Sequence, residues 1–272
     1  MILLEILFDK KALNKHRLNK LRNMKILGYS ERGIINSLIF SIGEDKELMG
    51  EFINKITLNE PFKLGKPDRY TVLLEQSFSD FGDADLVIII HYKDEKIEKA
   101  EDKIVLFIEG KVKTSGSNWI IKTQFDKYFQ KKEYKGYSSN LFYQLYFKKQ
   151  LIDNWLEIKK QIEKDKIDKK GEKVEIKSFF RNRKIGNNPI VEKAFNLIEC
   201  KEAYYIGIIP TLQEDINKFN DKIDFEMSFL SWEKVEEFCE ENKSKHPRLE
   251  KVIEIFDYND KQIYNRKKRI NN

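Results

Sequence analysis

Four charged side chains interrupt two apolar runs of this sequence, and their types and spacing are suited to chemistry. Asp83 and Asp85 stand at the start of the run DLVIII, and Glu109 and Lys111 stand at the end of the run KIVLFIEGK. Residues two apart in a strand point to the same face of a sheet, so each pair should project side by side. If the two runs pair antiparallel, Asp85, Glu109 and Lys111 meet at one end of the sheet.

The chemistry that such a cluster supports is metal-assisted hydrolysis. Two converging carboxylates repel each other and are costly to bury unless they are paired or hold a cation. Ligands that are all oxygen suit Mg²⁺, with Mn²⁺ as a substitute. Lys111 would orient or deprotonate a water, or stabilise charge that develops on a phosphate. A structural ion pair at a strand end explains the same residues without catalysis.

The elements that must hold these residues follow from the hydrophobic pattern. Strands are expected over 70–76, 84–92, 103–113 and 203–212, and helices near 30–42, 118–132, 139–165 and after 231. This order favours an α/β fold with a mixed central sheet flanked by helices. A basic amphipathic helix is expected within 1–27, and residues 28–272 are expected to form one domain with a helical and basic insertion at about 140–200.

Composition limits the class of protein. The 272 residues are 40% apolar and 12% aromatic, which is typical of a globular domain. Cys200 and Cys239 form no CxxC pair and suggest a reducing compartment. No stretch approaches the roughly 20 apolar residues of a membrane span, so we expect a soluble, cytoplasmic protein without a membrane partner. The net charge of +6 permits nucleic-acid binding without showing it.

An Asp that opens one strand and an E-x-K that closes the next resemble the PD-(D/E)xK, or restriction-endonuclease-like, nuclease superfamily, which includes RecB-like nucleases. The resemblance spans about 31–128 and rests on Asp85 and on Glu109-Gly110-Lys111. It implies a restriction-endonuclease-like core in which Asp85 and Glu109 hold the metal and Lys111 positions the attacking water. Ala84 stands in place of the usual proline, which leaves Asp83 as a rival ligand.

Other residues add to the resemblance, each with a simpler alternative. Glu31 matches an acidic residue of the first helix that completes the metal shell in many members, but the helix dipole also favours an acid there. Gln124 and Tyr128 are similar to the Q-x-x-x-Y of RecB-like members, which implies contact with the site or the substrate strand; ordinary packing is the alternative. Glu75 either lines the site from the first strand or faces solvent.

The resemblance implies a Mg²⁺-dependent nuclease that hydrolyses DNA, in a restriction or host-defence setting where a homodimer or a defence-complex partner would fit. A nuclease acting on RNA or branched DNA, and a non-catalytic module that binds nucleic acid or protein, are the alternatives. The residues expected to contact nucleic acid are Lys113, Lys122, Tyr128, Arg181 and Arg183.

Overall fold

The computed structural model describes residues 27–57, 67–92, 103–113, 117–130, 139–167, 183–200, 202–220 and 227–265. Only residue 27 of the expected basic segment 1–27 lies within these ranges, and Arg181 lies outside them. Within the described ranges, no helix combines the length and the apolar character that crossing a membrane requires.

Five strands of the described chain form one sheet. They are β1 (Arg69–Ser77), β2 (Asp83–His91), β3 (Lys103–Gly110), β4 (Glu202–Ile209) and β5 (Met227–Ser231), and they lie side by side in this order. Strand β2 is antiparallel to both of its neighbours, β1 and β3, and β4 and β5 continue parallel to β3. Every residue of β3 is buried, and so is every residue of β2 after the first. Both strands therefore read as continuous apolar runs, because both of their faces are covered.

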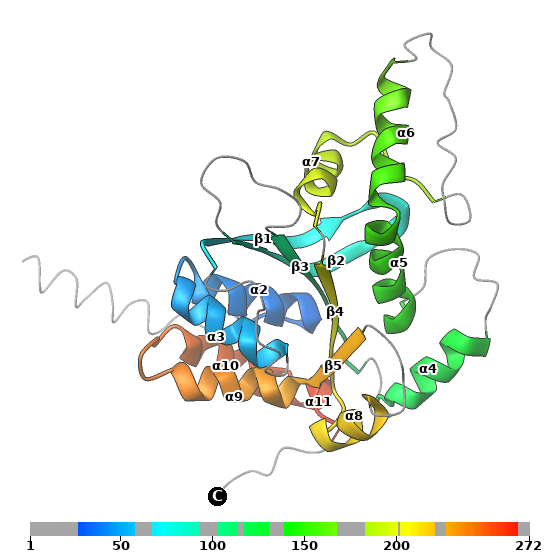
Figure 1. Cartoon of the computed structure of the whole chain (residues 1–272). Helices are drawn as coiled ribbons and strands as arrows, with labels where there is room; N and C mark the ends of the chain where they lie inside the picture. Colours follow the sequence, from blue (N-terminus) through cyan, green and yellow to red (C-terminus); the bar gives the residue numbers. More distant parts are fainter. Residues whose placement is uncertain are drawn as a thin grey trace, which may run out of the picture.

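Helices cover the two faces of the sheet, as Figure 1 shows. One face packs against α2 (Ser30–Ile42), α3 (Lys46–Ile56), α9 (Trp232–Asn242) and α10 (Leu249–Tyr258), and we call it the α2 side. The other face, the α5 side, packs against α5 (Leu141–Asp153), α6 (Trp155–Ile167) and α7 (Pro189–Leu197). The prediction of an α/β chain with a mixed sheet flanked by helices is confirmed. The remaining elements are η1 (Ser79–Phe81), α4 (Ile121–Gln130), α8 (Gln213–Asn220) and α11 (Asp260–Ile263).

Two boundaries differ from the sequence prediction. Strand β3 ends at Gly110 rather than at 113; its ladder with β2 stops at Ile108, and the backbone N–H of Lys111 still donates to Ile208 O of β4 at 2.8 Å. The helix expected over 139–165 is divided into α5 and α6 at Asn154, whose side-chain amide donates to Gln150 O at 2.8 Å. An asparagine that bonds its own backbone in this way competes with helical hydrogen bonding.

The range 140–200, which was expected to form an insertion, contains α5, α6 and α7. Of these, α5 lies against β3 and β4, and α7 lies against β1. Helix α5 begins at Asn140, whose side chain accepts hydrogen bonds from the N–H groups of Phe142 and Tyr143 at 3.0 and 3.4 Å. This cap sets the start of the helix that faces the end of β3.

Candidate active site

Asp85 lies where β2 and β3 separate. The antiparallel register ends at the pair Leu86–Ile108, and its continuation would place Asp85 opposite Glu109. Beyond that pair, the backbone N–H of Gly110 donates to a side chain of β2 instead of a backbone carbonyl: Asp85 Oδ2 accepts it at 2.9 Å. The expected antiparallel pairing thus brings Asp85 to the Glu109-Gly110-Lys111 segment.

The regular alternation of faces is broken at the start of β2. Leu86 packs on the α2 side, yet Ala84 packs on the α5 side, where strict alternation would not place it. Asp83 is exposed, whereas only 5% of Asp85 is exposed. The two carboxylates therefore differ in burial, and Asp85 is the one that is enclosed by the sheet and its helices.

Arg32 of α2 neutralises Asp85. Its Nε donates to Asp85 Oδ1 at 3.3 Å, and its terminal nitrogen lies 3.6 Å from Glu75 Oε2. Glu75 has a positive φ of 50° and also accepts the Asn36 Nδ2–H at 2.6 Å, so it contacts α2 next to the site. Although burial opposes the effect, the charges of Asp85 and Glu75 raise the pKa of Arg32.

Glu109 is paired on the other side of the sheet with Lys148 of α5. Glu109 is 1% exposed and Lys148 is fully buried, and Lys148 Nζ lies 3.6 Å from Glu109 Oε1. The same ammonium donates to the carbonyl oxygens of Phe81 at 3.0 Å and Asp83 at 2.9 Å. Lys148 therefore ties the turn before β2 to the end of β3.

Burial sets the protonation of this pair. It raises the pKa of Glu109 to about 7; Asp85 adds to the rise, while Lys148 and Lys111 oppose it. Burial also lowers the pKa of Lys148. The Oε1 atom of Glu109 has no hydrogen-bond partner within the described residues. Glu109 is thus a buried carboxyl group with a pKa near neutrality, and its Oε1 contacts the Lys148 ammonium at ion-pair distance, 3.6 Å.

Helix α2 packs directly on the Glu109-Gly110-Lys111 segment. A Cβ on Gly110 would lie 2.7 Å from the Cβ of Glu31, so only glycine fits between this segment and the first turn of α2. Lys111 is half-buried, and its carbonyl accepts the indole N–H of Trp232 at 2.8 Å. The first turn of α2 therefore lies against Gly110, and Lys111 is close enough to lower the pKa of Glu109.

Gln124 and Tyr128 of α4 contact the start of α5. The Gln124 Oε1 accepts Asn140 Nδ2–H at 3.3 Å. The ring of Tyr128 lies against Tyr143 and Tyr146, with centroids 4.8 and 6.1 Å apart. Burial raises the pKa of Tyr128 to about 12. These are the packing contacts that the simpler interpretation of the Q-x-x-x-Y pattern expects.

The basic residues singled out in the sequence occupy different surroundings. Lys113 is half-buried, and its backbone N–H donates to Gln262 O at 2.8 Å. The guanidinium of Arg183 lies 3.6 Å above the ring of Phe147 and donates to the Asp80 carbonyl. Lys122 is largely exposed and forms an ion pair of 2.8 Å with Asp126. Of these three side chains, that of Lys122 is the most accessible to a ligand in solution.

Sequence reasoning missed Arg32 and Lys148. Lys148 could have been found, because it follows Leu141 and Leu145 at the i, i+4, i+7 spacing of a buried helical stripe. A lysine in such a stripe is seldom buried without a partner. Arg32 carries no comparable signal, since it occupies an exposed position of α2.

The side chains at this site can supply Mg²⁺ with only a few protein ligands. Among the described residues, no group of three or more His, Cys, Asp or Glu side chains is arranged to hold a metal ion. Mg²⁺ is commonly bound by one or two carboxylates, with waters and substrate phosphates completing its shell. Asp85 and Glu109 are the two carboxylates available for this, and each already has a cationic partner, Arg32 at 3.3 Å and Lys148 at 3.6 Å. An ion would have to compete with Arg32, whose side chain is 48% exposed and free to move away.

The chain was compared with protein-family models, with curated proteins and with solved structures, and none of them matches. What the protein does must therefore be inferred from the geometry around Asp85 and Glu109.

Proposed function

We propose that this chain is a Mg²⁺-dependent nuclease with a restriction-endonuclease-like fold that hydrolyses phosphodiester bonds of DNA. The observation that carries the proposal is the hydrogen bond from the N–H of Gly110, between Glu109 and Lys111, to the Asp85 carboxylate. It joins the two parts of the motif at one end of a mixed sheet. The raised pKa of Glu109 adds support, because perturbed carboxyl groups are enriched at functional sites.

Asp85 and Glu109 would hold the metal, and Glu31, whose Cβ packs against Gly110 from the first turn of α2, would add a ligand. The bound ion would polarise the phosphate and make a coordinated water more acidic. Lys111, close enough to lower the pKa of Glu109, would orient the attacking water and stabilise negative charge on the phosphate.

Arg32 would change partners during the cycle. Without metal it neutralises Asp85 at 3.3 Å. Once an ion occupies Asp85, electrostatic repulsion favours the departure of the guanidinium, and the planar fork of an arginine suits phosphate oxygens. Arg32 would then contact the substrate, which keeps the site neutralised both before and after metal binding.

Lys148 would be a positioning residue. It is fully buried, so it does not reach solvent or substrate. Its bonds to the Phe81 and Asp83 carbonyls hold the start of β2 against Glu109. A catalytic carboxylate held in this way needs little reorganisation when its metal binds.

The test is cleavage by the purified full-length protein. Plasmid DNA, single-stranded DNA and RNA are incubated with Mg²⁺, Mn²⁺ or EDTA, and products are separated on gels. Glu109→Gln should abolish cleavage, and Lys111→Ala should lower it by roughly two to four orders of magnitude. Asp153→Asn, which removes a surface carboxylate from α5, serves as the control and should leave cleavage unchanged.

The second candidate is a non-catalytic module that binds nucleic acid or protein. It is favoured by the finding that both carboxylates already have cationic partners, Arg32 and Lys148. In that case no metal-dependent product forms from any substrate. Breaking either pair would then lower the melting temperature without changing an activity, and this outcome would overturn the nuclease proposal.

A further inference from the structure

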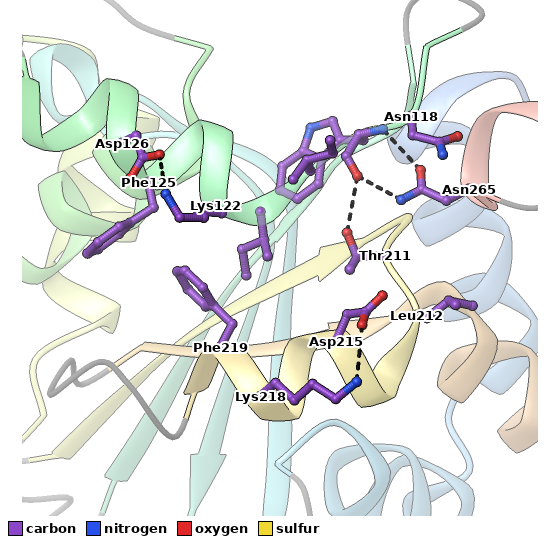
Figure 2. Close-up of a pocket in the computed structure, with 13 residues that line it drawn as sticks. Asn118, Lys122, Phe125, Asp126, Thr211, Leu212, Asp215, Lys218, Phe219 and Asn265 are labelled. Carbon is purple, nitrogen blue, oxygen red and sulfur yellow. Dashed lines mark hydrogen bonds and ion pairs between the residues drawn. The ribbon is translucent and has the colours of Figure 1, made fainter.

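A pocket opens beyond the carboxyl ends of β3 and β4. Its volume is about 740 Å³, which lies in the range of small-molecule sites. Figure 2 shows α4 and α8 on opposite sides of it, with Lys122 and Phe125 on the first helix and Phe219 on the second. In open α/β sheets, ligands bind in the crevice outside the carboxyl ends of parallel strands.

Aromatic rings form the walls of this pocket. Trp119, Phe125 and Phe219 are each half-buried, so part of each ring remains accessible. The rings of Phe125 and Phe219 meet edge to face, with centroids 5.4 Å apart. Such rings are a suitable surface for a planar ligand to stack on.

The backbone of Trp119 is fixed in place. Its N–H donates to Asn265 Oδ1 at 3.0 Å, and its carbonyl accepts Asn265 Nδ2–H at 2.7 Å and Thr211 Oγ1–H at 3.3 Å. These three bonds are visible in Figure 2. Because these bonds involve only backbone atoms of Trp119, they fix the position of its side chain and should persist when another residue replaces the tryptophan.

Two lysines stand at the rim. Lys122 of α4 pairs with Asp126 at 2.8 Å, and Lys218 of α8 pairs with Asp215 at 3.6 Å. Both lysine side chains are at least 70% exposed. Exposed ion pairs of this kind are weak, so either ammonium is free to turn to a phosphate.

The pocket lies beyond the same end of the sheet as the candidate active site. The N–H of Lys111 donates to Ile208 O at 2.8 Å, and Thr211 of the pocket follows three residues after Ile208. A ligand that extends from Glu109 along this edge of the sheet would reach the aromatic rings.

We propose that this pocket binds an unpaired nucleotide of the substrate strand, with its base stacked on the aromatic rings and its phosphate between Lys122 and Lys218. The inference rests on the proposed function for the chemistry of the strand, and it deepens that function by naming its substrate class as single-stranded or locally unpaired DNA. Paired bases would not enter, because their faces are covered by their neighbours in the duplex.

Tryptophan fluorescence tests the pocket separately from cleavage. Trp155 and Trp232 are 5% and 0% exposed, so quenching by a stacked base reports on Trp119. The full-length protein is titrated in EDTA with single-stranded oligodeoxythymidine, with a blunt duplex and with thymidine monophosphate. We expect strong quenching by the single strand, weak quenching by the mononucleotide at higher concentration, and none by the duplex. The quenching should disappear in Trp119→Phe.

Binding to the pocket variants is measured by anisotropy of a labelled single strand. Phe219→Leu keeps an apolar side chain and should weaken binding roughly fivefold to a hundredfold, the range for loss of one stacked base. Lys218→Gln should also weaken it, whereas Lys251→Gln, which breaks a similar i, i+3 pair with Glu254 on α10, should not. Melting temperatures establish that each variant is folded.

The outcomes separate this inference from the nuclease proposal. Quenching without metal-dependent cleavage would retain the pocket and overturn the nuclease. Cleavage without quenching, or unchanged affinity in Phe219→Leu, would overturn the pocket. Equal quenching by the duplex would overturn the unpaired substrate class, and tighter binding of thymidine monophosphate than of the strand would assign the pocket to a free nucleotide instead.

Discussion

Replacement of Lys148 by methionine should destabilise the protein, and the loss should grow as the pH rises. Lys148 Nζ lies 3.6 Å from Glu109 Oε1 and donates to the Phe81 and Asp83 carbonyls at 3.0 and 2.9 Å. Methionine is flexible and comparable in length, so Lys148→Met removes the cation and both donors without opening a large cavity. What remains is a buried carboxyl group without its cation.

The magnitude follows from the protonation of Glu109. Burial raises its pKa to about 7 in the parent, so the ionised form is the costly one in the folded state. A raised carboxyl pKa contributes stability that is complete below the ordinary value and is lost as the pH rises through the folded value. Lys148 opposes the rise, so its removal moves the folded pKa of Glu109 further up and makes the ionised form more costly.

Two limits can therefore be given for Lys148→Met. At about pH 5, Glu109 is protonated and the cost is that of two carbonyl groups without donors, about 1–3 kcal/mol for each of them. At about pH 8, a buried carboxylate has also lost its partner, and the cost should exceed that at pH 5 by about 3–5 kcal/mol. The lowered pKa of Lys148 acts in the same direction, since the parent loses stability as the pH falls through that value and the variant does not.

Urea unfolding in EDTA at the two pH values measures this difference. The double variant Lys148→Met with Glu109→Gln should lose the pH dependence, because neither titrating group remains. Lys149→Met is the matched control: this neighbouring lysine is part of an exposed pair with Asp153, and its loss should cost under about 1 kcal/mol at either pH. An equal cost of Lys148→Met at both pH values would refute the inferred pairing with Glu109.

Three further predictions concern the same end of the sheet. Gly110→Ala should cost about 1–3 kcal/mol in urea unfolding, because the added Cβ would lie 2.7 Å from Glu31 Cβ, and an unchanged midpoint would contradict the close packing of α2. Arg32→Gln should tighten Mn²⁺ binding in calorimetry, because Asp85 loses a competing cation, yet lower cleavage roughly a hundredfold; weaker Mn²⁺ binding would contradict this role. The affinity for single-stranded DNA should fall with salt, with a log–log slope of about 0.7 for each phosphate contact, and a flat titration would indicate a partner other than nucleic acid.

The sequence alone determined the fold class and the position of the motif along the chain. Apolar runs of strand length predicted β2 and β3, and the charges at their ends marked where Asp85 and Glu109 would lie. A continuous apolar run of strand length is a local property, and for this reason it located strands whose two faces are both buried. The local rule of alternating faces failed at Ala84, where the chain enters β2 from a turn and the faces no longer alternate.

Only the tertiary structure decided which cations meet the two carboxylates. Arg32 and Lys148 come from helices on opposite faces of the sheet. Arg32 precedes its partner Asp85 by 53 residues, and Lys148 lies in α5, well after its partner Glu109 in the chain. The backbone N–H of Lys111 donates to Ile208 O of β4, a strand that lies about a hundred residues further along the chain, and no local pattern predicts that pairing. The protonation of Glu109 and the pocket between α4 and α8 depend in the same way on burial by distant segments. Burial and charge pairing arise only when the helices pack on the sheet, whereas the apolar runs that predict the strands are already present in the unfolded chain.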